Sequence, residues 1–233
     1  MCYNIIAMNE KEVLKKIEEK NSEFEKFYEM LVEKNKAFNL TSVTEKKEAY
    51  AKHFYDSAYA SDLFEKNAGI IEVGSGGGFP SVPLKIVRED LHFTLLEATN
   101  KKCAYLEEVK KSFGFENFTV VCGRAEEKGK NEFREKFDYA VARAVAPLRS
   151  LVEYLLPLIE IGGKAVCYKG SDYLREADEA KNAIKILGGE IENIITYDLP
   201  EGYGGRALIV IKKINPTPKK YPRGMGKEKK CPL

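Results

Sequence analysis

A bend of closely spaced glycines, Gly74-Ser75-Gly76-Gly77-Gly78, directly follows the apolar run Ile70–Val73 in this chain of 233 residues. Glycine tolerates positive φ angles and lets a ligand approach the backbone, so the bend predicts a sharp turn from a strand into a helix. The first turn of that helix would present free backbone N–H groups. A ligand-binding turn fits this pattern, although a tight turn without a ligand has the same sequence.

The rest of the chain repeats the alternation of strand and helix. We expect strands at Ile70–Val73, Phe93–Glu97, Thr119–Cys122, Tyr139–Ala142 and Ala165–Tyr168, and helices at Val82–Val87, Lys101–Phe113, Pro147–Ile159 and Asp172–Leu187. This alternation predicts an α/β fold with a mostly parallel sheet covered on both faces. Only a turn-rich segment separates Ile191–Tyr197 from Ala207–Ile214, so a closing antiparallel strand should complete the sheet.

Two segments lie outside this alternation. Apolar residues before residue 65 recur at spacings near three, four and seven, which predicts helices that bury one face: Val13, Ile17, Phe24, Phe27, Tyr28, Leu31 and Phe38. After residue 214, six basic residues stand against one acidic residue, whereas the whole chain has a net charge of +2. We therefore expect an N-terminal helical extension at 1–65, a ligand-binding α/β domain at 66–214 and a basic tail at 215–233.

The composition disfavours several classes of protein. The five cysteines are scattered without a C-x-x-C pair and there are two histidines, so we expect neither a disulfide framework nor a metal site. The first residues do not resemble a signal peptide. The most apolar region, Leu151–Tyr168, is interrupted by charged residues and glycines and should not span a bilayer. The expectation is a reduced, cytoplasmic protein with no membrane segment.

The glycine bend distinguishes between three classes of cofactor. A phosphate-binding loop would end in Gly-Lys-Ser/Thr, whereas this bend ends in Gly78-Phe79-Pro80. A dinucleotide-binding turn would need glycine where Phe79 stands. The remaining pattern, E-x-G-x-G-x-G, resembles the first motif of class I methyltransferases, which bind S-adenosylmethionine on a Rossmann-like sheet. Glu97 ends the next strand, 23 residues after Gly74, where a carboxylate can accept hydrogen bonds from both ribose hydroxyls. We therefore predict cofactor contacts from Gly74, Gly76, Gly78 and Glu97.

Other strand ends carry polar residues that belong to the same predicted edge of the sheet. Gly123-Arg124-Ala125-Glu126-Glu127 follows the third strand, and its backbone could read the adenine, although an ordinary solvated loop fits equally well. Arg143 ends the fourth strand among small apolar residues and should point into the site, because ligands of open α/β sheets gather at the carboxyl ends of strands. Lys169 follows the fifth strand and is either a contact to the substrate or an ordinary loop lysine.

Several motifs in order resemble one family. Asn39-Leu40-Thr41, His53-Phe54-Tyr55-Asp56-Ser57, the glycine bend, Gly123–Glu127, Ala142–Pro147 and Lys169-Gly170 are similar to the signatures of the RsmG (GidB) family. Its members methylate N7 of a guanine in the 530-loop of bacterial 16S rRNA. The resemblance runs from about Phe38 to the C-terminus, and it implies that Gly74, Phe79, Ala125, Glu126 and Arg143 contact S-adenosylmethionine. Glu72 departs from the more usual Asp or Asn, and Arg223-Gly224-Met225-Gly226 departs from the usual basic-Pro-Gly ending.

The chemistry of this reaction explains why the sequence lacks an obvious catalytic dyad. Guanine N7 carries a lone pair and no proton, so its methylation needs alignment more than a general base. No acid or base is therefore required, and Arg143 and Lys169 are the candidates for contacting the reacting groups. A Pro-Cys pair for covalent C5 methylation of pyrimidines is absent, and so is the Asp/Asn-Pro-Pro-aromatic motif of amino-group methylation.

The basic tail and one helical pair bear on the RNA substrate. Lys219, Lys220 and Arg223 are the predicted RNA contacts, although a disordered, solubilising end would have the same composition. His53 and Asp56 lie three residues apart on one helical face. They meet each other or the target pocket, or they form a structural hydrogen bond in the core.

Three other functions compete with an rRNA methyltransferase. The first is a small-molecule methyltransferase, which would need an apolar lid. The second is an RNA-binding module that has lost its cofactor, and the third is a nucleotide-dependent oxidoreductase, disfavoured by Phe79. The expected partners are 16S rRNA or the 30S subunit, and we expect a monomer.

Overall fold

The computed structural model describes residues 10–233 and confirms the predicted α/β fold. Seven strands form one sheet in this range: β1 (Gly69–Val73), β2 (His92–Glu97), β3 (Phe118–Cys122), β4 (Phe137–Arg143), β5 (Ile159–Lys169), β6 (Gly189–Asp198) and β7 (Gly205–Lys213). Every strand predicted from the sequence overlaps one of these. The largest difference is at β5, which begins at Ile159 rather than Ala165 because Gly162 and Gly163 lie within the strand.

The order of the strands brings the ends of β1 and β4 together. Across the sheet the order is β3-β2-β1-β4-β5-β7-β6. β1 pairs in parallel with β2 and with β4, so Ile70 lies opposite both Phe93 and Tyr139. The chain builds outward from β1 to β3, returns to β4 and then builds in the other direction. Ligands of open α/β sheets bind at this reversal, beyond the carboxyl ends of the strands.

The predicted closing antiparallel strand is also confirmed. β7 runs antiparallel to β5 and to β6. A short helical turn, Pro200–Gly202, is the only regular element between β6 and β7. So short a connection can join antiparallel neighbours, whereas parallel neighbours need a crossover of a dozen residues or more.

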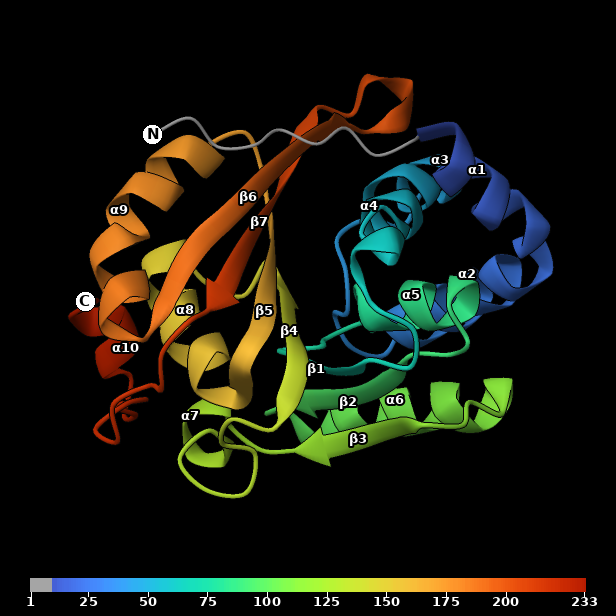
Figure 1. The fold of residues 1–233 in the computed structure, drawn as a ribbon. Coiled ribbons are helices and arrows are strands. Elements are labelled where there is room, and N and C mark those ends of the chain that lie inside the picture. Colours follow the sequence, from blue (N-terminus) through green and yellow to red (C-terminus); the bar gives the residue numbers. More distant parts are fainter. Residues whose placement is uncertain (1–9) are drawn as a thin grey trace.

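Helices cover both faces of the sheet (Figure 1). One face carries α1 (Glu10–Glu19), α2 (Asn21–Asn35), α3 (Lys46–Ala49), α4 (Asp56–Ala58), α5 (Ser81–Val87) and α6 (Asn100–Phe113). The other carries α7 (Ala125–Lys128), α8 (Leu148–Leu155), α9 (Tyr173–Ile186) and α10 (Lys227–Lys230). Single turns of tighter helix lie at Ser61–Leu63 and Leu156–Leu158. None of these helices, within the described part of the chain, is long and apolar enough to cross a membrane.

The N-terminal helices belong to the core of the first face. Five of the seven predicted inward residues are buried: Val13, Ile17, Phe24, Phe27 and Leu31. They share one cluster with Phe54, with Leu106 of α6 and with strand residues of the sheet. Tyr28 and Phe38 are only partly buried and pack against the same cluster. Burying a side chain such as Phe27 stabilises the fold by about 1.5–3 kcal/mol, so the extension contributes substantially to the stability of the chain.

A widened helical turn lies between α3 and α4. Residues Tyr50–Tyr55 form a π-helix that continues directly into α4. Single π-helical turns are rare and often mark functional sites, because the inserted residue changes the direction of the side chains. This turn carries His53 and leads into Asp56, the two residues that the sequence left between a site role and a structural role.

Candidate functional site

The glycine bend follows β1 as predicted and is fixed by backbone hydrogen bonds. Gly74, Gly76 and Gly78 have φ values of +73°, +54° and +90°, which other residues rarely adopt. The Gly74 amide donates to the carbonyl oxygen of Leu96 at 2.8 Å. A Cβ atom at Gly74 would lie 2.8 Å from Cγ2 of Val145, so the close approach of the loop after β4 requires glycine here.

Glu97 connects the bend to the next strand. One of its carboxylate oxygens accepts the amide of Gly76 at 2.9 Å, and the other accepts the amide of Thr99 at 2.8 Å. The side chain is buried, and these two bonds fix its orientation at the carboxyl end of β2. A carboxylate can accept about four hydrogen bonds, so Glu97 keeps capacity for a ligand hydroxyl.

A cavity of about 250 Å³, the smaller cavity, opens beside Glu97. Strand ends and the loops that follow them supply most of its wall: Val73, Gly74, Leu96, Glu97, Ala98, Gly123, Arg124, Ala125, Glu126 and Val145. Tyr154 of α8 and two residues from the C-terminal segment complete it. Four of the predicted cofactor residues, Gly74, Glu97, Ala125 and Glu126, are therefore together in one wall.

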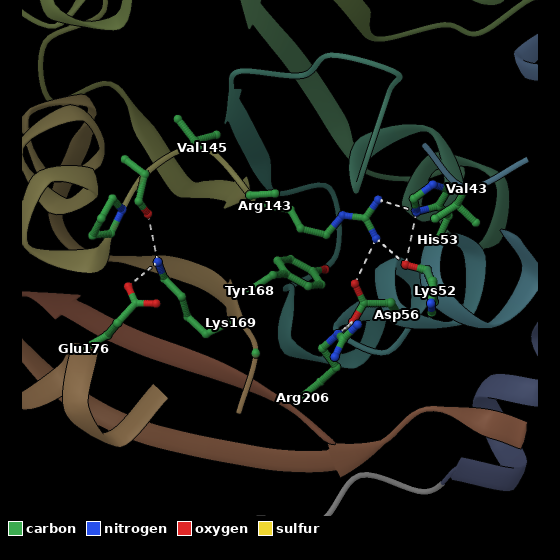
Figure 2. A pocket seen from close by; sticks show the side chains of 14 residues that line it. Val43, Lys52, His53, Asp56, Arg143, Val145, Tyr168, Lys169, Glu176 and Arg206 are labelled. Atoms are coloured by element: carbon green, nitrogen blue, oxygen red, sulfur yellow. Dashed lines mark hydrogen bonds and ion pairs between the residues drawn. The ribbon is translucent and has the colours of Figure 1, made fainter. Parts of the chain in front are cut away.

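A second cavity of about 640 Å³, the larger cavity, lies beyond the ends of β4 and β5 (Figure 2). Arg143, Ala146, Tyr168 and Lys169 line it from the sheet side, the π-helical segment supplies Lys52 and His53, and α4 supplies Asp56. Val145 lines both cavities. The two cavities therefore adjoin at the reversal point of the sheet. Ala144, just before Val145, has a φ of +55°, a conformation that non-glycine residues adopt mainly where function requires it.

Arg143 is held rigidly by the N-terminal helices rather than by its neighbours in sequence. One terminal nitrogen donates to the carboxylate of Asp56 and to the carbonyl oxygen of Lys52, both at 2.8 Å. The other lies 3.0 Å from Nδ1 of His53. The guanidinium also stacks over the ring of Phe79, 4.8 Å from its centroid. Its side chain is 13% exposed and that of Asp56 4%, so this is a nearly buried ion pair.

The hydrogen bonds of His53 determine its protonation. Because an arginine is always protonated and only donates, Nδ1 of His53 must accept, and the ring proton is then on Nε2. Nε2 lies 2.7 Å from Oγ1 of Thr41, which accepts it. Burial and the charge of Arg143 lower the pKa of His53 to about 3. His53 is therefore neutral at physiological pH, stacked on Phe79 with the ring centroids 4.3 Å apart.

Asp56 joins this cluster to the closing strands. Its second carboxylate oxygen accepts from the hydroxyl of Tyr197 at 2.7 Å and lies 3.8 Å from Nε of Arg206. Tyr197 is on β6 and Arg206 is on β7, so the last two strands of the chain help to position Arg143. No local pattern in the sequence predicts these two partners, because their contacts depend on the pairing of distant strands.

Lys169 lines the larger cavity but its ammonium is already paired. It donates to Glu176 at 2.7 Å and to the carbonyl oxygen of Ala146 at 2.9 Å. Glu176 also accepts the amide of Leu148 at 2.6 Å. Lys169 therefore ties the loop after β4 to α9, and a role in contacting substrate stays a prediction.

Three predicted cofactor residues, Gly76, Gly78 and Phe79, line neither cavity. Gly78 lies against the core of the first face, since a Cβ atom there would be 2.7 Å from Val82 and 3.4 Å from Phe27. Phe79 is 7% exposed and packs against Phe27 and His53. The predicted contacts of these three residues with the cofactor are untested, and the structure gives Phe79 a second role as the platform under Arg143 and His53.

Glu72, the acidic residue before the bend, is completely buried beneath it. One carboxylate oxygen accepts the amide of Ser81 at 3.3 Å, and the other has no partner among the described residues. Burial raises the pKa of Glu72 to about 8. The side chain is therefore largely protonated at neutral pH, so the acceptor expected from the sequence is mainly a neutral carboxylic acid.

The basic tail is ordered against the second face of the sheet. Lys219 and Lys220 are exposed, as an RNA contact requires. Arg223 instead forms a bidentate pair with Glu153 of α8, with its Nε at 2.9 Å and a terminal nitrogen at 2.7 Å. Its predicted contact with RNA would compete with this pair. Tyr221 is buried, so the tail is not merely a solvated end.

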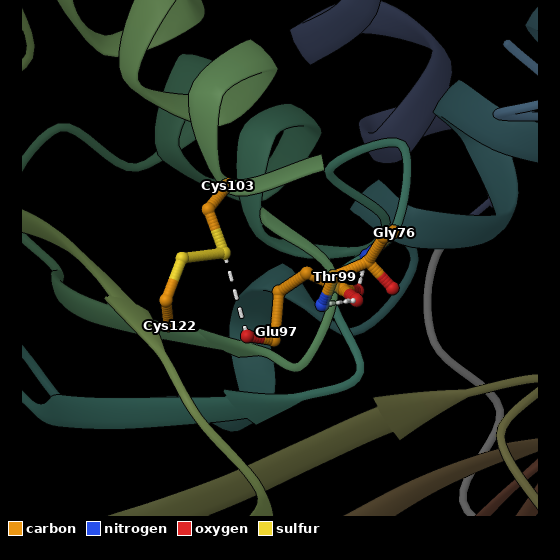
Figure 3. The surroundings of a disulfide bond; sticks show 5 residues. All are labelled: Gly76, Glu97, Thr99, Cys103 and Cys122. Atoms are coloured by element: carbon orange, nitrogen blue, oxygen red, sulfur yellow. Dashed lines mark hydrogen bonds between the residues drawn. A yellow bond between two sulfur atoms is a disulfide. The ribbon is translucent and has the colours of Figure 1, made fainter. Parts of the chain in front are cut away.

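The expectation of no disulfide was wrong for one pair of cysteines. Cys103 of α6 is joined to Cys122 at the end of β3 (Figure 3). The two are 19 residues apart in sequence, but α6 returns alongside β3 and brings their Cα atoms to 6.1 Å. Sγ of Cys103 also lies 3.4 Å from the carbonyl oxygen of Glu97. The pair therefore lies next to Glu97, which lines the smaller cavity, a proximity that scattered spacing in the sequence concealed.

Comparison with known proteins places this geometry among methyltransferases. Residues 20–201 match the family model GidB, described as rRNA small subunit methyltransferase G. The ribosomal RNA small subunit methyltransferase G of Brevibacillus brevis is 44% identical over 214 residues, which cover 91% of this chain and 90% of the relative. The protein of the same name from Lactobacillus johnsonii is 43% identical, with 93% and 92% covered.

Solved structures share the fold at low sequence identity. M. jannaschii TYW2 in complex with AdoMet aligns with a TM-score of 0.57 at 11% identity, over 76% of this chain and 81% of that one. The [4+2]-cyclase SpnF aligns with a TM-score of 0.54 at 13% identity, over 69% and 82%. These similarities concern the sheet and its helices.

Proposed function

Because this chain belongs to the rRNA small subunit methyltransferase G (GidB) family, we propose that it methylates N7 of a guanine in the 530-loop of 16S rRNA. Members of the family use S-adenosylmethionine, which when bound supplies an electrophilic methyl group on its sulfonium. The observation that carries the proposal is the junction of two cavities at Val145. One is lined by Gly74 and Glu97, and the other by a fixed arginine.

The smaller cavity fits the cofactor by its chemistry. Val73, Leu96 and Ala98 offer apolar surface to a flat ring, and Glu97 offers a preoriented acceptor for hydroxyl groups. The bare backbone of Gly74 leaves the wall next to Val145 without a side chain. At about 250 Å³, this cavity is slightly smaller than a usual ligand pocket of about 300–1,000 Å³. We infer that it takes the adenosine part and that the methionine part faces the larger cavity.

The larger cavity suits a base whose reacting atom needs no deprotonation. His53 has a pKa of about 3 and already accepts from Arg143, so it is too weak a base to remove a proton from an amino group. Guanine N7 needs none, because its lone pair attacks directly. Arg143 is fixed by three partners and can donate to the neighbouring O6 acceptor while N7 stays free. Holding the base and the methyl group in line can lower the barrier by about 7–11 kcal/mol.

We infer that 16S rRNA, free or in the 30S subunit, reaches the site along the exposed lysines of the tail, and that the protein is a cytoplasmic monomer. Lys219 and Lys220 are exposed, whereas Arg223 is paired with Glu153. If both lysines contact phosphates, Lys219→Gln with Lys220→Gln should reduce the slope of log affinity against log salt by about 1.4–1.8. An unchanged slope would remove these lysines from the RNA interface.

The methylation state of 16S rRNA tests the proposed reaction. Cells that lack the protein should lose N7-methylguanosine from the 530-loop, and expression of the wild-type chain should restore it. Arg143→Met should fail to restore it, whereas Arg175→Met, which alters an exposed arginine on α9, should succeed. If the modified nucleotide persists without the protein, the proposed substrate is wrong. If it disappears but Arg143→Met restores it, the assignment of the larger cavity is wrong.

A further inference from the structure

The C-terminal segment reaches the wall of the smaller cavity. Gly226 and Lys229, more than 100 residues after Glu97 in sequence, line this cavity together with Gly74, Glu97, Ala125 and Glu126. Lys229 belongs to α10, which packs against α8. No pattern in the sequence connects these residues to a cofactor site. The tail was expected to be a separate basic segment.

The start of the tail is anchored in the core. Lys213, at the end of β7, is fully buried and donates to Thr217 at 2.7 Å and to the carbonyl oxygen of Leu156 at 2.5 Å. The amide of Thr217 donates to Glu135 at 2.8 Å, and its hydroxyl donates to the carbonyl oxygen of Leu187. Leu156, Glu135 and Leu187 come from three separate segments of the chain. The path of the chain after β7 is therefore fixed before it reaches the cavity.

A second anchor lies next to the cavity itself. Arg223 makes its bidentate pair with Glu153, and its backbone amide donates to the same carboxylate at 2.8 Å. Glu153 is fully buried, so losing this partner would leave an unpaired buried charge. The next residue of α8, Tyr154, lines the smaller cavity. One helix thus holds the tail and supplies the wall that the tail completes.

The turn after Arg223 places the chain against α7 and the loops on either side of it. Lys130 donates to the carbonyl oxygen of Arg223 at 3.0 Å, and the buried carboxylate of Glu228 accepts the amide of Gly224. A Cβ atom at Gly224 would lie 3.6 Å from Glu126. The segment is therefore packed on the loop after β3 and α7, and α10 places Lys229 at the edge of the cavity.

We propose that residues 224–230 form a wall of the cofactor site and that Lys229 contacts bound S-adenosylmethionine. This inference rests on the proposed assignment of the smaller cavity to the cofactor. The ammonium of Lys229 can donate to a ring nitrogen of the adenine, the part of the cofactor that the smaller cavity is proposed to hold. Lys230, the next residue of α10, does not line the cavity and is exposed. The basic tail then has two roles, because Lys219 and Lys220 remain available to RNA.

Calorimetry with S-adenosylmethionine and with S-adenosylhomocysteine tests this without RNA or turnover. Lys229→Ala should weaken binding of at least one of the two ligands by about three- to tenfold, the loss expected for one hydrogen bond. Lys229→Arg should retain binding within about twofold, because the donor remains. The matched control Lys230→Ala removes a charge from the same helix and should bind both ligands like the wild type. A chain ending at Arg223 should lose more affinity than Lys229→Ala while its melting by circular dichroism remains cooperative.

The outcomes separate this inference from the proposed function. If the wild type binds the cofactor and Lys229→Ala binds both ligands equally well, Lys229 is no contact and the inference fails. If Lys229→Ala and Lys230→Ala lose the same affinity, the effect is general electrostatics and the inference also fails. If the wild type binds neither ligand, the assignment of the cavity, and with it the proposed function, is wrong.

Discussion

Replacing Asp56 by Asn should expose how far the site depends on the N-terminal helices. Asp56 is 3% exposed and accepts from Arg143 at 2.8 Å and from Tyr197 at 2.7 Å. The substitution keeps the shape of the side chain but leaves the guanidinium without its counter-charge. Removing one partner of a buried ion pair typically costs about 3–5 kcal/mol, because the other charge stays desolvated. In a chain of this length, that corresponds to a loss of roughly 6–20 °C in Tm.

Urea unfolding followed by circular dichroism is the suitable assay, since the chain has no tryptophan. The midpoint should fall with little change in the slope of the transition, as expected when only the native state is weakened. Asp178→Asn is the matched control. Asp178 pairs with Lys181 on the surface and its side chain is 74% exposed, so its loss should leave the urea midpoint almost unchanged.

A double variant makes the reasoning refutable. If the cost of Asp56→Asn comes from the stranded guanidinium, Arg143→Met in the same chain should return a large part of the lost stability, with a coupling of about 2–3 kcal/mol. Methylation should not return, because the fixed donor in the larger cavity is gone. An Asp56→Asn variant no less stable than Asp178→Asn would show that the pair is not effectively buried, and the account of how Arg143 is positioned would be wrong.

Three further predictions concern buried groups near the site. The pKa of His53 is lowered to about 3, so between pH 6 and pH 5 the unfolded chain binds a proton that the folded chain does not. The free energy of unfolding should therefore fall by about 1.4 kcal/mol as the pH is lowered from 6 to 5. In His53→Gln this decrease should be absent. The pKa of Glu72 is raised from its ordinary value of 4.5 to about 8, so its contribution to stability is full below pH 4.5 and is lost as the pH rises through 8. The free energy of unfolding of Glu72→Gln, relative to that of the wild type, should therefore rise between pH 7 and pH 9. A thiol reductant should lower the free energy of unfolding of the wild type by up to about 3 kcal/mol, since the disulfide between Cys103 and Cys122 closes a segment of 19 residues. The urea midpoint should fall accordingly, whereas that of Cys122→Ser should not respond.

The sheet and the glycine bend were predictable because their signals are local. A strand, a glycine turn and a helix follow one another within 20 residues, and the end of β2 is reached by counting from Gly74 to Glu97. Ala125 and Glu126 after β3 were predicted only from the resemblance to the family, because their loop has no distinctive local pattern. Local patterns also predicted which residues of α1 and α2 are buried, because one face of a helix repeats at fixed spacing.

The partners of the charged residues were not predictable in the same way. Arg143 is 87 residues from Asp56, and Arg223 is 70 residues from Glu153, so neither pair leaves a local pattern. Whether a side chain such as Lys169 faces a ligand or an internal partner depends on the packing of α9, which periodicity does not specify. The disulfide was missed for the same reason, because α6 returns the chain to β3 over a distance that the sequence does not reveal.

The two segments outside the sheet complete the two cavities, which suggests where specificity lies. The helical segment before β1 supplies His53 and Asp56 to the larger cavity, and the segment after β7 supplies Gly226 and Lys229 to the smaller one. Structures as different in function as TYW2 and a [4+2]-cyclase share the sheet with this chain at 11% and 13% identity. A shared sheet therefore cannot select the substrate, because function depends on the site and not on the fold. If the N-terminal helices fix the base and the tail closes around the cofactor, substitutions in the first should change methylation without changing cofactor affinity, and substitutions in the second should do the reverse.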